Sequence, residues 1–150
     1  ILVGFPGENE EEFAESLAFV REMEFAGGHV FPYSERPGTA AARMAGVVAP
    51  AARKQRSAAM RQVLEASTAS YQQRFLGQEM GVLWESALSL GPQEWKMSGL
   101  TDNYLRVTST APRELWNQIT PVRLHTASQS GLYGLVRRSL ARGTDGLCLL

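Results

Sequence analysis

The sequence predicts an α/β segment with parallel strands, followed by a small all-β barrel. Residues 1–33 have the pattern of a strand, a helix and a second strand, an order that implies parallel pairing. From Met80 onward, short strand-like segments alternate with turn residues, which is typical of a closed or nearly closed β-barrel. We therefore expect one unit over residues 1–75, a second over 76–140, and a tail over 141–150.

The first strand is expected at residues 1–3, with no turn, cap or initiator methionine before it, so we expect the chain to be a fragment of a longer protein. A helix should follow, because Asn9 and Glu12 have the spacing of a capping box and the neighbouring glutamates suit a helix N-terminus. One face of this helix should pack against another part of the fold. Its apolar residues at helical spacing are Phe13, Leu17 and Val20, and Gly27-Gly28 should end it.

Residues 29–33 predict the second strand, which runs into a turn at 36–39 and an Ala-, Gly- and Val-rich connector at 40–49. Pro50 is well placed to open a long helix that ends at Gly77. The residues expected on one stripe of this helix are Met60, Val63, Leu64, Ser67, Tyr71 and Phe75.

The barrel strands are expected where β-branched, aromatic and aliphatic residues gather between turn residues. Their predicted ranges are 80–85, 95–97, 104–108, 122–126 and 132–136. Trp84, Trp95 and Trp116 are expected to pack within the barrel or at an interface rather than to stack on bases.

Composition excludes several classes of protein. The formal net charge is zero, so any RNA-binding face must be local, and we expect neither DNA nor a membrane as a partner. The only cysteine is Cys148, which rules out disulfides within the chain and a cysteine-rich metal site, and fits the cytoplasm. The bases of the second half are nearly all arginine, which suits phosphate, although a solvated surface explains the composition better: Arg106, Arg113, Arg123, Arg137, Arg138 and Arg142.

The motif GFPGE at residues 4–8 lies where a strand ends and a helix begins. Ligands bind at this end of parallel strands, and glycines allow the backbone to approach them closely. Free N–H groups at a helix N-terminus add donors. A tight turn without any ligand explains the motif equally well.

Residues 1–13 resemble the late-barrel segment of radical-SAM methylthiotransferases, which carry GFPGET followed by acidic residues and Phe. Asn9 stands where Thr is usual. The resemblance implies that this turn lies beside bound S-adenosylmethionine. It assigns four residues to the cofactor pocket: Gly4, Pro6, Gly7 and Glu8.

Residues 29–41 are similar to the HVFPYSxRPGTxAA block of the same family. Arg36 stands where methylthiotransferases of a ribosomal protein tend to have an acid, which points to the tRNA branches. The HVFPYS form resembles the branch that acts on threonylcarbamoyladenosine. Arg36 is thus a candidate substrate contact, with a structural ion pair as an equal alternative, and His29 alone is more typical of a packed strand residue.

Residues 98–107 resemble the GHTDNYIRV-type stretch of the TRAM domain, an OB-like barrel that binds RNA, with Leu100 where His is common. Residues 81–85 and 117–124 are similar to other strands of that domain. The candidate RNA contacts are Tyr104, by stacking on a base, and Arg106 and Arg123, by contacting phosphate. The alternative is a core tyrosine and solvated arginines.

The resemblance implies the end of a radical-SAM (partial TIM-type) barrel followed by a TRAM domain. The parent would add a methylthio group to threonylcarbamoyladenosine beside the tRNA anticodon, using S-adenosylmethionine and two 4Fe–4S clusters. Because three thiolates hold a radical-SAM cluster and this chain has one cysteine, we expect no metal site and no catalytic residue here. The alternatives are the isopentenyladenosine-directed enzyme and a non-catalytic RNA-binding module.

Overall fold

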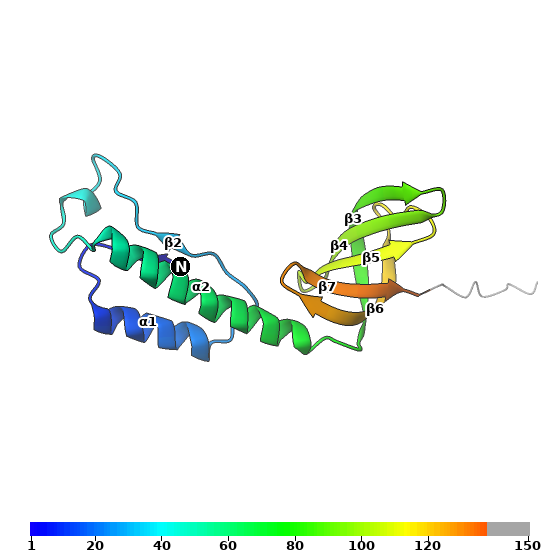
Figure 1. Ribbon diagram of the computed structural model, residues 1–150, viewed down its shortest axis with the longest axis horizontal. Coiled ribbons are helices and arrows are strands. Elements are labelled where there is room, and N and C mark those ends of the chain that lie inside the picture. The colour runs from blue at the N-terminus through cyan, green and yellow to red at the C-terminus, as the bar shows by residue number, and fades with distance from the viewer. Residues whose placement is uncertain (138–150) are drawn as a thin grey trace, which may run out of the picture. The chain divides into compact units, whose positions relative to one another are not determined.

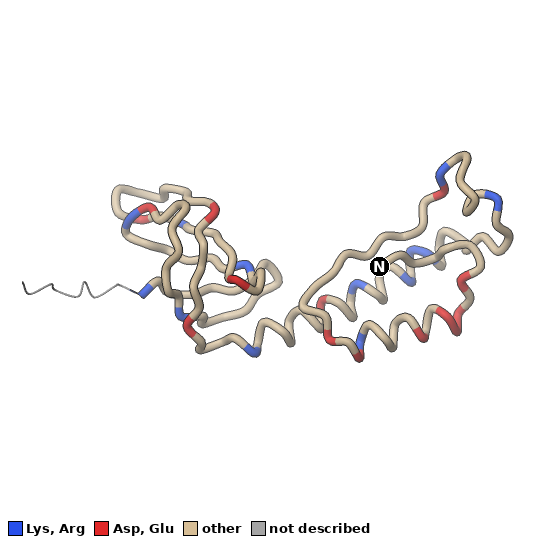
Figure 2. Tube along the Cα trace, turned by 180° about the vertical axis from the view of Figure 1, so that it is seen from behind, with Lys and Arg blue, Asp and Glu red and all other residues tan. Residues whose placement is uncertain are grey.

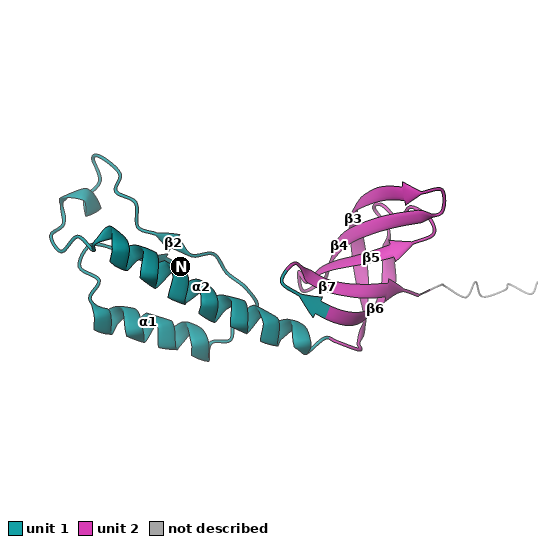
Figure 3. Ribbon diagram, in the orientation of Figure 1, with its two compact units in different colours: residues 1–75, 127–129 teal, residues 76–126, 130–150 magenta. Residues whose placement is uncertain are grey.

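The computed structural model describes residues 1–137. It divides into two compact units, which are coloured separately in Figure 3. Unit 1 contains Ile1–Phe75 together with Ala127–Gln129, and unit 2 begins at Leu76. The predicted tail over residues 141–150, with Arg142 and Cys148, lies outside the described residues, and so does Arg138.

Unit 1 consists of two short strands and two helices, and one turn of 3-10 helix lies between the second strand and the second helix (Figure 1). The strands β1 and β2 pair in parallel, with Leu2 opposite Phe31 and Val3 opposite Pro32, which confirms the predicted strand–helix–strand unit. The second strand is shorter than expected, and His29 precedes it. Two strands do not make a barrel, so the larger barrel stays a prediction. The elements are β1 (Leu2–Val3), α1 (Glu10–Glu22), β2 (Phe31–Pro32), η1 (Ala41–Arg43) and α2 (Pro50–Gln73).

Helix α1 begins at the predicted capping box. Asn9 accepts a hydrogen bond from the Glu12 backbone N–H at 2.9 Å, and the Glu12 carboxylate accepts one from the Asn9 N–H, also at 2.9 Å. These bonds satisfy two N–H groups that the first turn of a helix leaves without partners. The predicted apolar face is confirmed, because Phe13 and Val20 are buried and Leu17 packs against them.

Helix α2 begins at Pro50 and has no side-chain cap. Met60 and Leu64 are buried in the core shared with Val3 and α1, and Val63 packs against it. Ser67 and Tyr71 continue the predicted stripe as half-buried residues outside this core cluster, whereas the prediction is wrong for Phe75, which lies beyond the end of the helix. The helix ends at Gln73, before Gly77, and Tyr71 instead contacts Phe75 through their rings, 5.1 Å apart.

Unit 2 is a closed five-stranded barrel with the strand order β3-β4-β5-β7-β6. Strand β3 pairs in antiparallel fashion with β4 and β6, and β4 does so with β5, whereas β5 and β7 pair in parallel at Val107–Leu132 and Thr108–Tyr133. This arrangement is that of an OB-like barrel and confirms the predicted small β-barrel. The strands are β3 (Glu79–Gly91), β4 (Glu94–Thr101), β5 (Arg106–Ala111), β6 (Ile119–Ser128) and β7 (Gly131–Val136).

Alternating residues of the strands fill the barrel interior. Val82 and Trp84 on β3, and Val122 and Leu124 on β6, are completely buried, while the residues between them point outward. The Trp84 indole N–H donates to Thr120 Oγ1 at 2.8 Å, so its polar atom is satisfied. Packing at Trp84 is therefore as predicted, whereas Trp116 is 61% exposed.

One predicted strand boundary is wrong at a candidate site residue. Tyr104 does not belong to β5, which begins at Arg106, but to the turn before it, where its φ is +63°. The Thr101 side chain fixes this turn by accepting from the Leu105 N–H at 2.9 Å, and the Tyr104 N–H donates to the Thr101 carbonyl at 3.0 Å. This local side-chain bond shapes the turn between β4, which ends at Thr101, and β5, which begins at Arg106.

Candidate functional site

The GFPGE turn joins β1 to α1. Val3, at the end of β1, is buried beneath the helices, and Gly4 and Gly7 then take φ values of +72° and +94°. These values favour glycine, because side chains strain the backbone in this region. Glycine is favoured at position 4 for a second reason, because a Cβ there would lie 2.3 Å from the Arg53 Cγ of α2. The close approach at Gly4 is thus made by a side chain of the chain itself.

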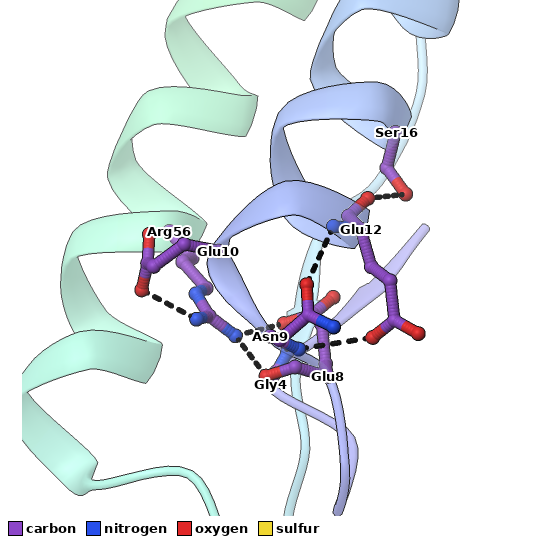
Figure 4. A network of polar contacts seen from close by, with 7 residues as sticks. All are labelled: Gly4, Glu8, Asn9, Glu10, Glu12, Ser16 and Arg56. Atoms are coloured by element: carbon purple, nitrogen blue, oxygen red, sulfur yellow. Dashed lines mark hydrogen bonds and ion pairs between the residues drawn. The ribbon is translucent and has the colours of Figure 1, made fainter.

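An arginine of α2 holds this turn in place (Figure 4). The Arg56 Nη1 donates to both the carbonyl and the Oε2 of Glu8, at 2.9 and 2.6 Å, and its Nη2 donates to Glu10 Oε1 at 2.6 Å. The same Glu8 oxygen accepts from the Gly4 N–H at 2.6 Å. We name the side chains of Arg56 and Glu8, with the Gly4 N–H, the Arg56 clamp.

The two charged side chains of the Arg56 clamp are mostly buried, and Arg56 has a further, exposed partner in Glu10. The Arg56 and Glu8 side chains are 7% and 14% exposed, whereas Glu10 is 81% exposed. Hydrogen bonding to Glu10 raises the pKa of Arg56, burial lowers it, and the bond to Glu8 raises it again, with a net rise. The guanidinium also lies over the Phe13 ring, 5.4 Å from its centroid. Arg56 is therefore a permanent cation in a partly apolar surrounding.

The clamp changes the interpretation of the predicted cofactor residues. Glu8 is committed to Arg56, and the Gly4 N–H to Glu8. The Gly7 N–H donates to the Gly46 carbonyl at 2.8 Å, and the Glu8 N–H to the Phe5 carbonyl at 2.9 Å. These three N–H donors of the turn are thus satisfied within the chain.

The surface of the turn that is left for a ligand is mostly apolar. Pro6 is buried, while the Phe5 ring is 38% exposed and packs edge-on against Tyr33, with their centroids 5.4 Å apart. On the neighbouring strand pair, Leu2 and Phe31 stand opposite each other and are 51% and 61% exposed. The exposed rings and the aliphatic side chain thus leave an apolar surface beside the turn.

Arg56 lies outside the recognised sequence motifs, although the sequence carries a signal for it. Arg56, Met60 and Leu64 are four residues apart, so they share the buried stripe of α2. An arginine at a core position requires a buried partner, because an unpaired buried charge is costly. The glutamate of the GFPGE motif supplies that partner.

The other predicted residues of unit 1 lie in exposed chain. Arg36 precedes a turn in which its carbonyl accepts from the Thr39 hydroxyl at 2.8 Å, and its own side chain is exposed. Within residues 1–137 Arg36 forms no ion pair, so the structural alternative finds no support there. His29 is also exposed, and its carbonyl accepts from the Ile1 amino group at 2.6 Å, which contradicts the packed strand position.

The predicted RNA contacts of the barrel fall into two places. Arg106 follows Tyr104 by two residues, stands opposite Leu100 on β4, and lies 3.6 Å from the Glu85 carboxylate. Tyr104 is 83% exposed, which excludes the core alternative. Arg123 on β6 instead stands opposite Glu79, the first residue of β3, so the structure does not bring it to the other two.

Two apolar residues that were not predicted lie in the same row as Arg106. Leu83 stands opposite both Leu100 and Ile119 on its two neighbouring strands, so the row runs from Arg106 to Ile119 across the outer surface. Leu83 is 39% and Ile119 is 72% exposed. The signal was present, because Val82 and Trp84 point inward and the leucine between them must therefore point outward. We name these four residues and Tyr104 the barrel face.

Residues 1–137 contain neither a cluster of metal ligands nor a helix that could span a membrane. No group of three or more His, Cys, Asp or Glu side chains there could hold a metal ion. The helices of this region are too short or too polar to cross a membrane. With a single cysteine in the whole sequence, the residues of this chain do not fit a radical-SAM cluster, which needs three thiolates.

No protein-family model matches the chain, but curated proteins do. It is 33% identical over 124 residues to the threonylcarbamoyladenosine tRNA methylthiotransferase MtaB of Bacillus subtilis, which is 83% of this chain and 28% of that protein. It is 33% identical over 134 residues to the tRNA-2-methylthio-N(6)-dimethylallyladenosine synthase of Maricaulis maris, 89% of this chain and 29% of that protein. Its identity to the Bacillus licheniformis enzyme of that name is 34% over 134 residues, 89% and 26% of the two chains.

These relatives confirm the relationship expected from the motifs. The chain spans between 26 and 29% of their length, so it matches only one part of each. By its similarity to them over most of its own length, the chain belongs to the family of radical-SAM tRNA methylthiotransferases.

Proposed function

We propose that this chain is the C-terminal part of a cytoplasmic tRNA methylthiotransferase acting on threonylcarbamoyladenosine next to the anticodon. Residues 1–75 would form the end of its radical-SAM barrel, and residues 76–140 its TRAM domain. The observation that carries this proposal is the alignment to the Bacillus subtilis enzyme. Its 124 residues exceed the length of either unit, so the similarity includes parts of both.

The threonylcarbamoyladenosine branch is favoured by the block at residues 29–41, which has the HVFPYS form and an exposed Arg36. The dimethylallyladenosine branch is the second candidate, because its members match 134 residues with the same degree of identity. Mass spectrometry of tRNA nucleosides from cells lacking the gene separates the two. Loss of the methylthio group from threonylcarbamoyladenosine alone supports the first branch, and loss from dimethylallyladenosine supports the second.

In the complete enzyme, S-adenosylmethionine and two 4Fe–4S clusters would supply the radical chemistry and the methyl group. This chain would contribute the apolar side of the cofactor pocket through Gly7 and the exposed ring of Phe5, while Gly4 and Pro6, which are buried, would shape the turn. Glu8 would act through Arg56, by keeping the turn in its shape. The cluster thiolates would have to come from other residues of the complete enzyme, because this chain has a single cysteine. This chain alone should therefore be inactive.

A non-catalytic RNA-binding module is the remaining alternative, favoured by the single cysteine. The coding sequence upstream of residue 1 distinguishes it from the enzyme. An in-frame CxxxCxxC motif there supports the methylthiotransferase. A reading frame without that motif would leave only RNA binding.

The barrel face fits a single-stranded nucleic acid, since it combines an exposed aromatic ring, an arginine and exposed aliphatic residues. The test is fluorescence anisotropy of the chain with an anticodon stem-loop RNA. Tyr104→Ala should weaken binding by about 1–3 kcal/mol if the ring stacks on one base. Arg106→Ala should weaken binding and lower the slope of log K against log salt by about 0.7 for a single-stranded contact.

Arg21→Ala is the matched control, because it removes an exposed arginine of α1. It should leave affinity and salt slope unchanged. If Tyr104→Ala and Arg106→Ala bind the RNA as tightly as the unchanged chain at every salt concentration, the barrel face is not the RNA-binding surface.

A further inference from the structure

The first half of α2 carries three bases that the Arg56 clamp does not use. Arg53, Lys54 and Arg61 line a pocket of about 320 Å³ at the end of β2, together with Tyr33 and Ser57. The residues that line this pocket include no acid. All of them belong to unit 1.

Two of the three bases are held in position by neighbouring atoms. The Arg53 Nη1 donates to the Tyr33 carbonyl at 2.7 Å, and its side-chain stem lies against Gly4. The Arg61 Nη1 donates to the Ser57 hydroxyl at 2.8 Å, and Ser57 is itself 2% exposed. Because a guanidinium has five N–H donors, each arginine keeps others for a ligand.

Pairing within the described chain does not neutralise these bases. Over residues 1–137 none of Arg53, Lys54 and Arg61 forms an ion pair with a carboxylate. The first turn of α2 has no acid, and cations near a helix N-terminus are disfavoured by the helix dipole. Helix stability therefore does not account for this positive charge.

We propose that this pocket binds a backbone phosphate of the RNA on which the parent enzyme acts. The inference rests on the proposed function, which supplies RNA as the partner. Phosphate suits the site because it is a compact anion that accepts forked bonds from guanidinium groups and a point-charge contact from lysine. Unit 1 would then contact RNA directly, in addition to the barrel face.

The test uses the whole chain with an anticodon stem-loop RNA and the double variant Lys54→Gln/Arg61→Gln. Both side chains are exposed, and the substitutions leave Arg53 against Gly4 and the Arg56 clamp intact. We expect the affinity for RNA to fall about five- to tenfold at moderate salt. The slope of log K against log salt should fall by roughly 1.4, two contacts at about 0.7 each.

Two other variants make the outcomes distinguishable. Arg21→Gln on α1 removes an exposed base outside the pocket and should change nothing, and circular dichroism at 222 nm should show equal helix content in all chains. Unchanged RNA binding by the double variant, with a loss in Arg106→Ala, would overturn the phosphate site and leave the proposed function standing. A loss in the double variant but not in Arg106→Ala would support the phosphate site and reject the barrel face. Failure of the unchanged chain to bind RNA would overturn both the phosphate site and the barrel face as RNA-binding surfaces.

Discussion

Replacing Arg56 by methionine should destabilise unit 1 and leave the barrel unaffected. Methionine keeps much of the apolar stem but removes the three hydrogen bonds to Glu8 and Glu10. The Glu8 carboxylate then keeps only its bond from the Gly4 N–H, although its side chain is 14% exposed.

The size of the effect is set mainly by Glu8. Hydrogen bonds to charged groups contribute roughly 1.5–3 kcal/mol, and removing one partner of a buried pair costs about 3–5 kcal/mol. The pair with Glu10 adds about 0.5 kcal/mol at most, because that carboxylate is 81% exposed. We therefore expect Arg56→Met to lower the free energy of unfolding of unit 1 by about 3 kcal/mol.

The two units can be followed separately in one urea titration. Both α-helices, α1 and α2, lie in unit 1, so ellipticity at 222 nm follows unit 1. The three tryptophans, Trp84, Trp95 and Trp116, lie in unit 2, so their fluorescence reports on the barrel. With a urea m-value of about 1 kcal/mol/M for a unit of this size, the 222 nm midpoint should fall by about 3 M, or helicity should be lost without urea.

Controls separate the clamp from a general loss of charge. Arg21→Met on the exposed face of α1 should move neither transition. Glu8→Gln keeps an oxygen for the Gly4 N–H and should cost less than Arg56→Met, and the double variant should cost less than the two single losses added together. A 222 nm midpoint that does not move in Arg56→Met, or additive losses in the double variant, would refute the clamp.

Two glycine pairs give further predictions, each with its own control. Gly4→Ala should destabilise unit 1 by about 3 kcal/mol, because the added Cβ would lie 2.3 Å from the Arg53 side chain and the residue has a positive φ. Gly7→Ala should cost only the backbone strain of about 1–2 kcal/mol, since no atom lies within 4 Å of its added Cβ. The 222 nm transition measures both, and equal losses would contradict the contact. Gly99→Ala should destabilise the barrel by about 3 kcal/mol, because its Cβ would lie 2.1 Å from a carbonyl oxygen of β3, whereas Gly91→Ala on the same hairpin has open space. Tryptophan fluorescence distinguishes them, and a Gly99→Ala barrel as stable as Gly91→Ala would contradict the close strand approach.

The elements of unit 1 could be predicted because their signals are local. A capping box, helical spacing of apolar residues and Pro50 at a helix start each depend on a few neighbouring residues. The prediction failed at the end of α2, because apolar and aromatic residues at helical spacing continue past Gln73 into the turn. A stripe in the sequence does not state where the partner surface ends.

The barrel strands were predictable from alternation, but their lengths and loops were not. Strand β3 pairs with β6 only from Glu79 to Leu83, and its pairing with β4 carries it on to Gly91. Alternation along one strand does not show how far a neighbouring strand follows it. Tyr104 was placed in a strand because its residue type favours one. The Thr101 side chain instead turns the chain at Tyr104, and the result is a ring more exposed than a strand position predicts.

The candidate sites show the same division. The motif identified the correct turn, but the expected role of Glu8 changed once Arg56, 48 residues away, was found beside it. No spacing rule joins these two positions, because the contact depends on how α1 and α2 pack. Likewise, the order of residues along β6 could not show that Arg123 stands apart from Arg106.

A net charge of zero conceals a separation of charge within unit 1 that matters for any polyanion. Helix α1 carries five acids and one base, whereas α2 carries four bases and one acid (Figure 2). Among the described residues, the ion pair between Arg56 and Glu10 is the one that joins the two helices. Arg56 also pairs with Glu8, which lies in the turn before α1. What is left is an acidic surface on α1 and an unpaired basic pocket on α2. A phosphate backbone should therefore be repelled by α1 and attracted to α2. If RNA reaches this unit, the loss of Lys54 and Arg61 must lower the affinity for RNA, whereas the loss of Arg21 must not.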